Sequence, residues 1–150
     1  MNIILEGAGH VRYFTDMEET LDALGISARD YDWFVSDVET NCGEDVFSLK
    51  DRWMSGDELQ ASLGNHIQFI YGVFSAFPPG QRRTIEIPPC VYDNASYWSG
   101  TAISPQLPDA LFEIACWDSS ATILIGMPRV AISSFKRRFP GAKPLESIRR

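Results

Sequence analysis

Two aspartates one residue apart, Asp30 and Asp32, come nearest to the spacing of a metal site. Carboxylate oxygens suit a hard divalent cation, but such an ion needs several oxygen ligands that converge on it. The two histidines, His10 and His66, lack the H-x-x-x-H and H-E-x-x-H spacings that place two zinc ligands on one helix. We therefore expect no metal ion, and a small metal- or nucleotide-dependent hydrolase that uses Asp30, Asp32 and a histidine is the alternative function.

Two other spacings resemble catalytic motifs but are incomplete. Ser133 and Lys136 have the S-x-x-K spacing of some acyl-serine enzymes, in which a lysine one turn along a helix deprotonates the serine, yet the companion motifs are missing. The segment Gly7-Ala8-Gly9 begins like a dinucleotide-binding fingerprint, but Arg12 stands where the third glycine belongs. We therefore predict no catalytic residues and no cofactor, and we expect that the protein is not an enzyme.

Negative charge is concentrated toward the amino end of the chain. The 150 residues contain 20 Asp and Glu against 13 Lys and Arg, which gives a net charge of −7. Residues 1–58 hold 14 of the acids and four of the bases, whereas residues 129–150 hold seven bases and one acid. The run Lys136-Arg137-Arg138 is interpreted as cations that offset a helix dipole. No nucleic-acid partner is expected, because most of the chain would repel phosphate.

Composition predicts one folded domain, residues 1–150, and the lack of a recognisable signal peptide predicts that it lies in the cytoplasm. Apolar residues make up 45% of the chain, which is enough for a core, and no apolar run reaches the ~18 residues of a membrane span. The amino end lacks the basic segment of a signal peptide. The three cysteines, Cys42, Cys90 and Cys116, are far apart and suit reduced thiols. No membrane partner is expected, and the oligomeric state is left open.

The pattern of elements favours an α+β fold with a mainly antiparallel sheet and two or three short helices packed on it. A capping-box sequence at Thr15-Asp16-Met17-Glu18 and another at Ser55-Gly56-Asp57-Glu58 each begin an amphipathic helix that ends at a glycine. Runs of successive strands, with too few strand–helix–strand alternations for a parallel sheet, favour this fold. Helices are predicted over 16–24, 55–64 and 129–139, strands over 33–38, 66–77 and 84–87, a hairpin over 111–126, and a long covering loop over 93–109.

Acidic side chains alternate with aromatic ones in the first part of the chain. Carboxylates speed the encounter with a basic protein, and a desolvated aromatic side chain anchors it. The alternative is an ordinary solvated acidic surface whose aromatics lie in the core, as we expect for Trp33, whereas Trp53 is expected to be exposed. The predicted partner-binding residues are Asp30, Asp32, Asp37, Glu39, Glu44, Asp45, Trp53, Asp57 and Glu58.

Two segments of the chain resemble a family of small acidic bacterial immunity proteins. They run from Asp30 to Asn41, with the sequence DYDWFVSDVETN, and from Phe112 to Pro140, including Trp117-Asp118-Ser119-Ser120. The resemblance implies a cytoplasmic antidote that binds one cognate toxin in bacterial competition and inhibits it without chemistry of its own. Together with the charge distribution, it predicts a basic toxin domain, such as a nuclease, whose active-site cleft the carboxylates cover.

Overall fold

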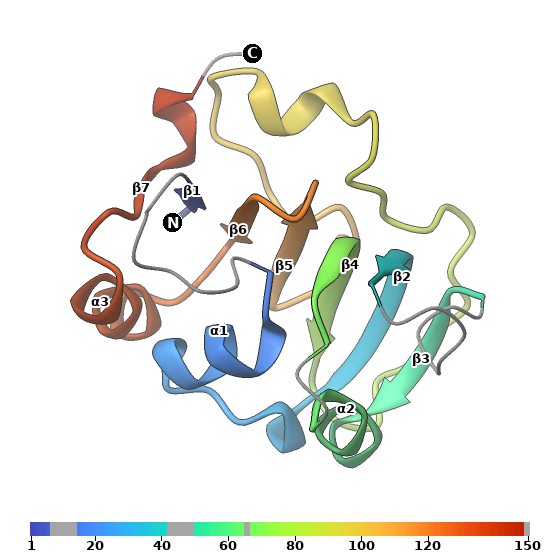
Figure 1. The fold of residues 1–150 in the computed structure, drawn as a ribbon. Coiled ribbons are helices and arrows are strands. Elements are labelled where there is room, and N and C mark those ends of the chain that lie inside the picture. Colours follow the sequence, from blue (N-terminus) through green and yellow to red (C-terminus); the bar gives the residue numbers. More distant parts are fainter. Residues whose placement is uncertain (7–14, 42–49, 65–66, 149–150) are drawn as a thin grey trace.

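The computed structural model describes residues 1–6, 15–41, 50–64 and 67–148 (Figure 1). Helices cover one side of a sheet, and a long irregular segment covers the other. The helices are α1 (Met17–Leu24), α2 (Gly56–Leu63) and α3 (Arg129–Arg138), with 3-10 turns η1 (Ala28–Asp30), η2 (Ala95–Trp98) and η3 (Leu145–Ser147). The strands are β1 (Ile3–Glu6), β2 (Asp32–Thr40), β3 (Arg52–Ser55), β4 (Phe69–Phe77), β5 (Phe112–Trp117), β6 (Ala121–Ile125) and β7 (Lys143–Pro144).

The seven strands form one antiparallel sheet in the order β3-β2-β4-β5-β6-β1-β7, so the predicted α+β class is confirmed. The central place of β4 agrees with its apolar sequence on both faces, and the predicted hairpin is the pair β5 and β6. The prediction of a strand over 84–87 is wrong. Only Ile85 of its two isoleucines packs on the core, while Ile87 is 83% exposed, so the alternation in sequence does not reflect one buried face.

Local hydrogen bonds explain where the first two helices begin. Asp16, rather than Thr15, caps α1, because its side chain accepts from the backbone N–H of Glu19. Ser55 and Glu58 form the predicted capping box of α2, in which the Ser55 hydroxyl accepts from the Glu58 N–H and the Glu58 carboxylate accepts from the Ser55 N–H. These bonds satisfy N–H groups that the first turn of a helix leaves without a partner.

The two faces of the sheet carry different cores because side chains alternate along each strand. The helix face is lined by residues such as Trp33, Phe74 and Ile114, which pack with α1, α2 and α3. The opposite face carries Phe34, Val73 and further apolar side chains in two smaller clusters. This second face is covered by residues 78–111, between β4 and β5, which we call the cover segment. In Figure 1 it runs in yellow-green and yellow up the right of the view and across the top, away from the helices.

Polar side chains on β2 fasten the first part of the cover segment to the sheet. The Asp32 carboxylate accepts from the backbone N–H of Gly80, at 3.1 Å, and the Ser36 hydroxyl donates to the carbonyl of Pro89, at 2.7 Å. The Asp37 carboxylate accepts from the backbone N–H groups of Val91 and Tyr92, at 2.8 and 2.9 Å. Asp37 interrupts the register of β2 with a left-handed backbone (φ 54°), and this irregularity in the strand accompanies its bonds to the cover segment.

Glu113 on β5 holds the second part of the cover segment. Its side chain is fully buried, accepts from the Tyr97 hydroxyl at 2.6 Å and accepts from the Gln106 backbone N–H at 2.8 Å. The Gln106 side chain in turn donates to the Tyr97 oxygen and to the Cys90 carbonyl. Burial raises the pKa of Glu113, because removal from water disfavours the charged form more than these hydrogen bonds favour it.

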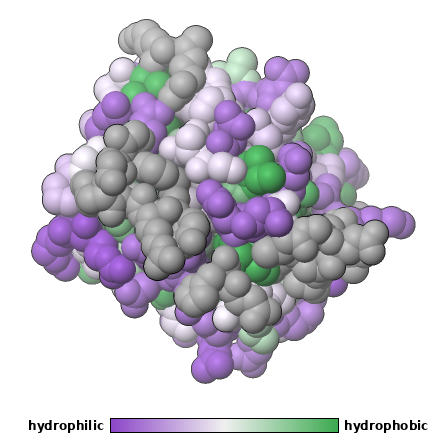
Figure 2. Space-filling model, in the orientation of Figure 1, coloured by the Kyte–Doolittle hydropathy of each residue, from purple (hydrophilic) through white to green (hydrophobic). Residues whose placement is uncertain are grey.

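None of the helices among the described residues is long and apolar enough to cross a bilayer. On the face seen in Figure 2, the residues drawn in colour are largely hydrophilic, and the hydrophobic areas visible among them are small and separate.

Substitution of Gly56 tests the close contact between η1 and the start of α2. A Cβ at this position would lie 2.3 Å from the Ala28 carbonyl oxygen, whereas at Gly64 the nearest atom would be 3.6 Å away. We expect Gly56→Ala to lower the free energy of unfolding by roughly 1–3 kcal/mol, since the backbone must shift. Gly64→Ala, in a helical conformation, should instead raise it by roughly 0.4–1 kcal/mol. Equal effects of the two substitutions in urea unfolding would contradict this packing.

Glu113 should make stability fall as pH rises. Its raised pKa means that the folded protein holds this proton above pH 4.5, the ordinary value, where the unfolded chain has released it. The free energy of unfolding therefore decreases through that interval, by at most about 1.4 kcal/mol per pH unit. Glu113→Gln removes the titration, so the wild type should lose stability relative to the variant as the pH rises above 4.5, the ordinary value of this carboxyl. A difference between the two proteins that does not change with pH would contradict the assignment.

Candidate functional site

Three predicted partner-binding acids lie together where η1 meets the start of α2. Asp30, Asp57 and Glu58 are all exposed on these two elements, which touch at Gly56. The Asp57 carboxylate lies 3.3 Å from the Arg29 guanidinium, and both side chains are mostly exposed to water. The Glu58 pKa is lowered, mainly because the carboxylate accepts from the Ser55 N–H. This corner thus keeps exposed negative charge, although Glu58 also caps a helix.

Asp32 has a structural role instead of an exposed one. It is 9% exposed, and its carboxylate lies 3.1 Å from the Arg82 Nε in addition to the bond from Gly80. Asp30, two residues earlier, is in water, so the two aspartates occupy different environments. No group of three potential metal ligands occurs within the described ranges, and His10 and His66 lie outside them.

The other predicted acids belong to the far end of β2 or lie outside the described residues. Asp37 is committed to the cover segment, and its own N–H donates to the Asp51 carboxylate at 3.0 Å. Glu39 is exposed and sits opposite Tyr71 of β4. Glu44 and Asp45 fall in the range 42–49, which the structure does not describe. The predicted acids that the structure describes therefore do not form one continuous face along β2.

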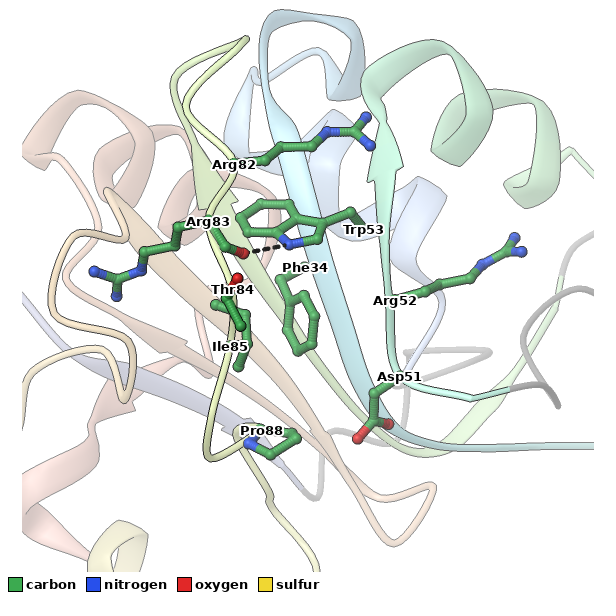
Figure 3. A pocket seen from close by; sticks show the side chains of 9 residues that line it. All are labelled: Phe34, Asp51, Arg52, Trp53, Arg82, Arg83, Thr84, Ile85 and Pro88. Atoms are coloured by element: carbon green, nitrogen blue, oxygen red, sulfur yellow. Dashed lines mark hydrogen bonds between the residues drawn. The ribbon is translucent and has the colours of Figure 1, made fainter.

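Trp53 lies beside arginines at the β3 edge of the sheet. Its indole N–H donates to the Arg83 carbonyl at 3.0 Å, and its ring meets Phe34 and Phe77 edge to face. Figure 3 shows the pocket beside it, with the Arg82 guanidinium above the indole. The pocket has a volume of about 570 Å³ and is lined by Phe34, Asp51, Arg52, Trp53, Arg82, Arg83, Thr84, Ile85 and Pro88. Trp53 is partly buried, and the charged side chains nearest to it are mainly cationic.

A second pocket, on the covered face of the sheet, joins aromatic rings with carboxylates. It has a volume of about 360 Å³ and we call it the aromatic pocket; its lining residues are Tyr71, Tyr92, Asp93, Asn94, Ala95, Trp98 and Trp117. Tyr71 and Tyr92 meet edge to face, with ring centres 5.1 Å apart and planes at 90°. Trp98 and Trp117 are also 5.1 Å apart, at 70°. Four rings from β4, β5 and the cover segment thus surround one hollow.

The charge around the aromatic pocket is negative. Asp93 lines it, and the Tyr71 hydroxyl donates to the Asp118 carboxylate at 3.4 Å. Glu39 lies opposite Tyr71 in the β2–β4 register, and no Lys or Arg is among the described lining residues. The pKa of Tyr71 is raised, first by burial and then by Asp118 and Glu39 among others, so the hydroxyl stays neutral. A cation would be favoured here both by the carboxylates and by the ring faces.

Hydrogen bonds at the base of the cover segment fix the residues of the aromatic pocket. Asp37 holds the backbone of Tyr92, directly before Asp93. Asn94 caps η2 by accepting from the Ser96 N–H, and its amide donates to the Cys90 carbonyl. The pocket is therefore built on the same polar contacts that fasten the cover segment.

Two bases near the carboxyl end form ion pairs with acids that are not among the predicted partner-binding residues. Arg138, at the end of α3, pairs with Glu19 at 3.4 Å and with Asp22 at 3.0 Å on α1. Lys143 lies 3.6 Å from Glu6. Arg138, which was interpreted with Lys136 and Arg137 as offsetting a helix dipole, thus also joins α3 to α1. These pairs do not include any of the carboxylates around the aromatic pocket.

None of the described predicted partner-binding residues lines the aromatic pocket, although Glu39 lies opposite Tyr71 and Asp37 accepts from the Tyr92 backbone N–H. The rings of the pocket were not among the predicted site residues, because they come from segments up to 46 positions apart, Tyr71 to Trp117. A local signal was present in two aromatic–aspartate pairs, Tyr92-Asp93 and Trp117-Asp118. Both pairs lie outside the first part of the chain, where the charge pattern led us to expect aromatics among carboxylates.

Comparisons of the chain with known protein families, with curated proteins and with solved structures found no match. Function is therefore inferred from the geometry of the described residues.

Asp32 and Asp30 can be compared directly by the same substitution. Asp32→Asn should lower the free energy of unfolding by about 1 kcal/mol, because a charge-assisted bond from a partly exposed arginine is lost while the amide can still accept from Gly80. Asp30→Asn, on the exposed neighbour, should change it by less than about 0.5 kcal/mol. Chemical unfolding measures both, and an equal or larger loss for Asp30→Asn would contradict the structural role of Asp32.

Proposed function

We propose that the protein is a stoichiometric inhibitor of a basic protein domain, an immunity protein that blocks a cognate bacterial toxin. The observation that carries this proposal is the aromatic pocket with carboxylates at its rim and no cation among its described lining residues. An exposed acidic surface speeds association with a basic partner, and partly buried aromatic rings supply the desolvated contact that slows dissociation. Neither step requires chemistry by this chain.

The arrangement of charge supports an encounter with a cationic surface. The chain has a net charge of −7, and the exposed acids at the η1–α2 corner and around the aromatic pocket keep their carboxylates at the surface. A toxin that acts on an anionic substrate needs a cationic cleft, which is complementary to such a surface. Inhibition then follows from occupation of that cleft, since a bound carboxylate surface both fills it and repels the substrate.

The test uses the polypeptide encoded immediately upstream of this chain in its source genome, since an antidote is expected to follow its toxin. Co-expression should restore growth to cells that produce this polypeptide, and the purified proteins should form a complex in equal amounts. The association rate should fall at least about tenfold between roughly 10 mM and 150 mM salt, because exposed charges are screened. A toxic neighbour that neither binds this chain nor is neutralised by it would refute the proposal.

Charge-neutral variants identify the surface that makes the contact. Glu39→Gln with Asp93→Asn should slow association and weaken its salt dependence, and asparagine tolerates the left-handed backbone of Asp93 (φ 54°). Glu86→Gln, an exposed acid elsewhere on the cover segment, serves as the matched control. Asp30→Asn with Asp57→Asn applies the same measurement to the η1–α2 corner. A complex whose association rate is unchanged in all of these variants would contradict the proposed recognition.

A further inference from the structure

We infer that the aromatic pocket receives a single arginine side chain of the partner. This inference rests on the proposed function, because it names the chemistry that the same site recognises. The pocket has the size and the lining of a site for one planar cation: a hollow of about 360 Å³, four aromatic rings and a carboxylate in its wall.

The geometry of the rings favours a planar cation. The two ring pairs meet edge to face, at 90° for Tyr71 and Tyr92 and 70° for Trp98 and Trp117, so ring faces point in different directions around the hollow. A cation over the face of an aromatic ring is attracted by the negative charge of the π system, most strongly by tryptophan. Guanidinium can stack on one ring while it presents its N–H edge to another group.

The carboxylates supply acceptors for that edge. Asp93 lines the aromatic pocket with a left-handed backbone at φ 54°, and Asp118 lies at the β5–β6 turn within reach of the Tyr71 hydroxyl. Glu39 adds a third negative charge next to Tyr71. Arginine suits this arrangement better than lysine, because guanidinium is less strongly hydrated and its fan of N–H donors matches carboxylate oxygens.

The pocket beside Trp53 provides the contrast within the same protein. It is larger and also aromatic, but Arg52, Arg82 and Arg83 line it. Arg82 already occupies the position above the Trp53 ring, with its centre 5.9 Å from the ring centre. An incoming arginine would meet like charge there, whereas the described residues that line the aromatic pocket include no Lys or Arg.

The experiment titrates the full chain with short blocked peptides of glycine that contain one arginine, one lysine or one citrulline. Citrulline has the shape of arginine without its charge. The readout is the NMR signal of the indole N–H groups of the four tryptophans, each assigned by substitution with phenylalanine. Trp33 and Trp53 serve as internal controls, because their N–H groups donate to the carbonyls of Ala28 and Arg83.

The arginine peptide should shift the signals of Trp98 and Trp117 and leave those of Trp33 and Trp53 in place. The lysine peptide should bind more weakly, and the citrulline peptide should bind least. Tyr92→Ala should weaken binding of the arginine peptide by about twofold to thirtyfold, the range that a cation–π contact contributes. Tyr92 is 62% exposed, so this variant should fold, and Asp93→Asn provides a second variant that keeps the ring.

Several results would overturn the inference. Equal binding of the citrulline peptide would mean that charge is not recognised, and a shift confined to Trp53 would move the site to the other pocket. No shift by any peptide at millimolar concentration would also refute it. These outcomes are separate from the test of inhibition: a chain that neutralises its toxin but ignores the arginine peptide retains the proposed function and loses this inference.

Discussion

The structure depends on polar side chains that lie on an otherwise apolar face of the sheet and hold the cover segment. Asp32, Ser36 and Asp37 of β2 bind its first part, and Glu113 of β5 binds its second part. A segment with little regular structure leaves many backbone groups in need of partners, and burial makes an unpaired group costly. These four side chains form hydrogen bonds with backbone groups of the cover segment at several points along it, and these bonds hold the irregular segment as a layer against the sheet.

The aromatic pocket is a consequence of this fastening. Two of its rings, Tyr71 and Trp117, stand on the sheet, whereas Tyr92 and Trp98 belong to the cover segment. The Asp37 carboxylate accepts from the backbone N–H of Tyr92, and the Glu113 carboxylate accepts from the hydroxyl of Tyr97, the residue before Trp98, so these bonds fix the backbone beside both rings. The acidic sequence therefore contains two kinds of carboxylate. Buried ones such as Asp32 and Glu113 build the surface, and exposed ones such as Glu39 give it its charge.

The helices, the hairpin and the long loop could be predicted because each leaves a local signal: capping residues, a period of two or 3.6, or prolines. The strand predicted over 84–87 shows the limit of that reasoning, since alternation does not reveal that Ile87 remains in water. Short strands such as β3 and β7 are defined by pairing with distant residues and were not predicted. The same holds for the site. Whether an aspartate is exposed, as Asp30 is, or buried against a guanidinium, as Asp32 is, depends on contacts made by residue 82.

Amide hydrogen exchange measures directly whether polar side chains of the sheet hold the cover segment in place. The backbone N–H groups of Val91, Tyr92 and Gln106 donate to the carboxylates of Asp37 and Glu113, and so they should exchange as slowly as amides of the sheet. Their neighbours without such bonds should exchange faster. If these three amides exchange at the rate of an unfolded chain, the cover segment is not fastened by these side chains, and the pocket built on it is not a preformed binding site.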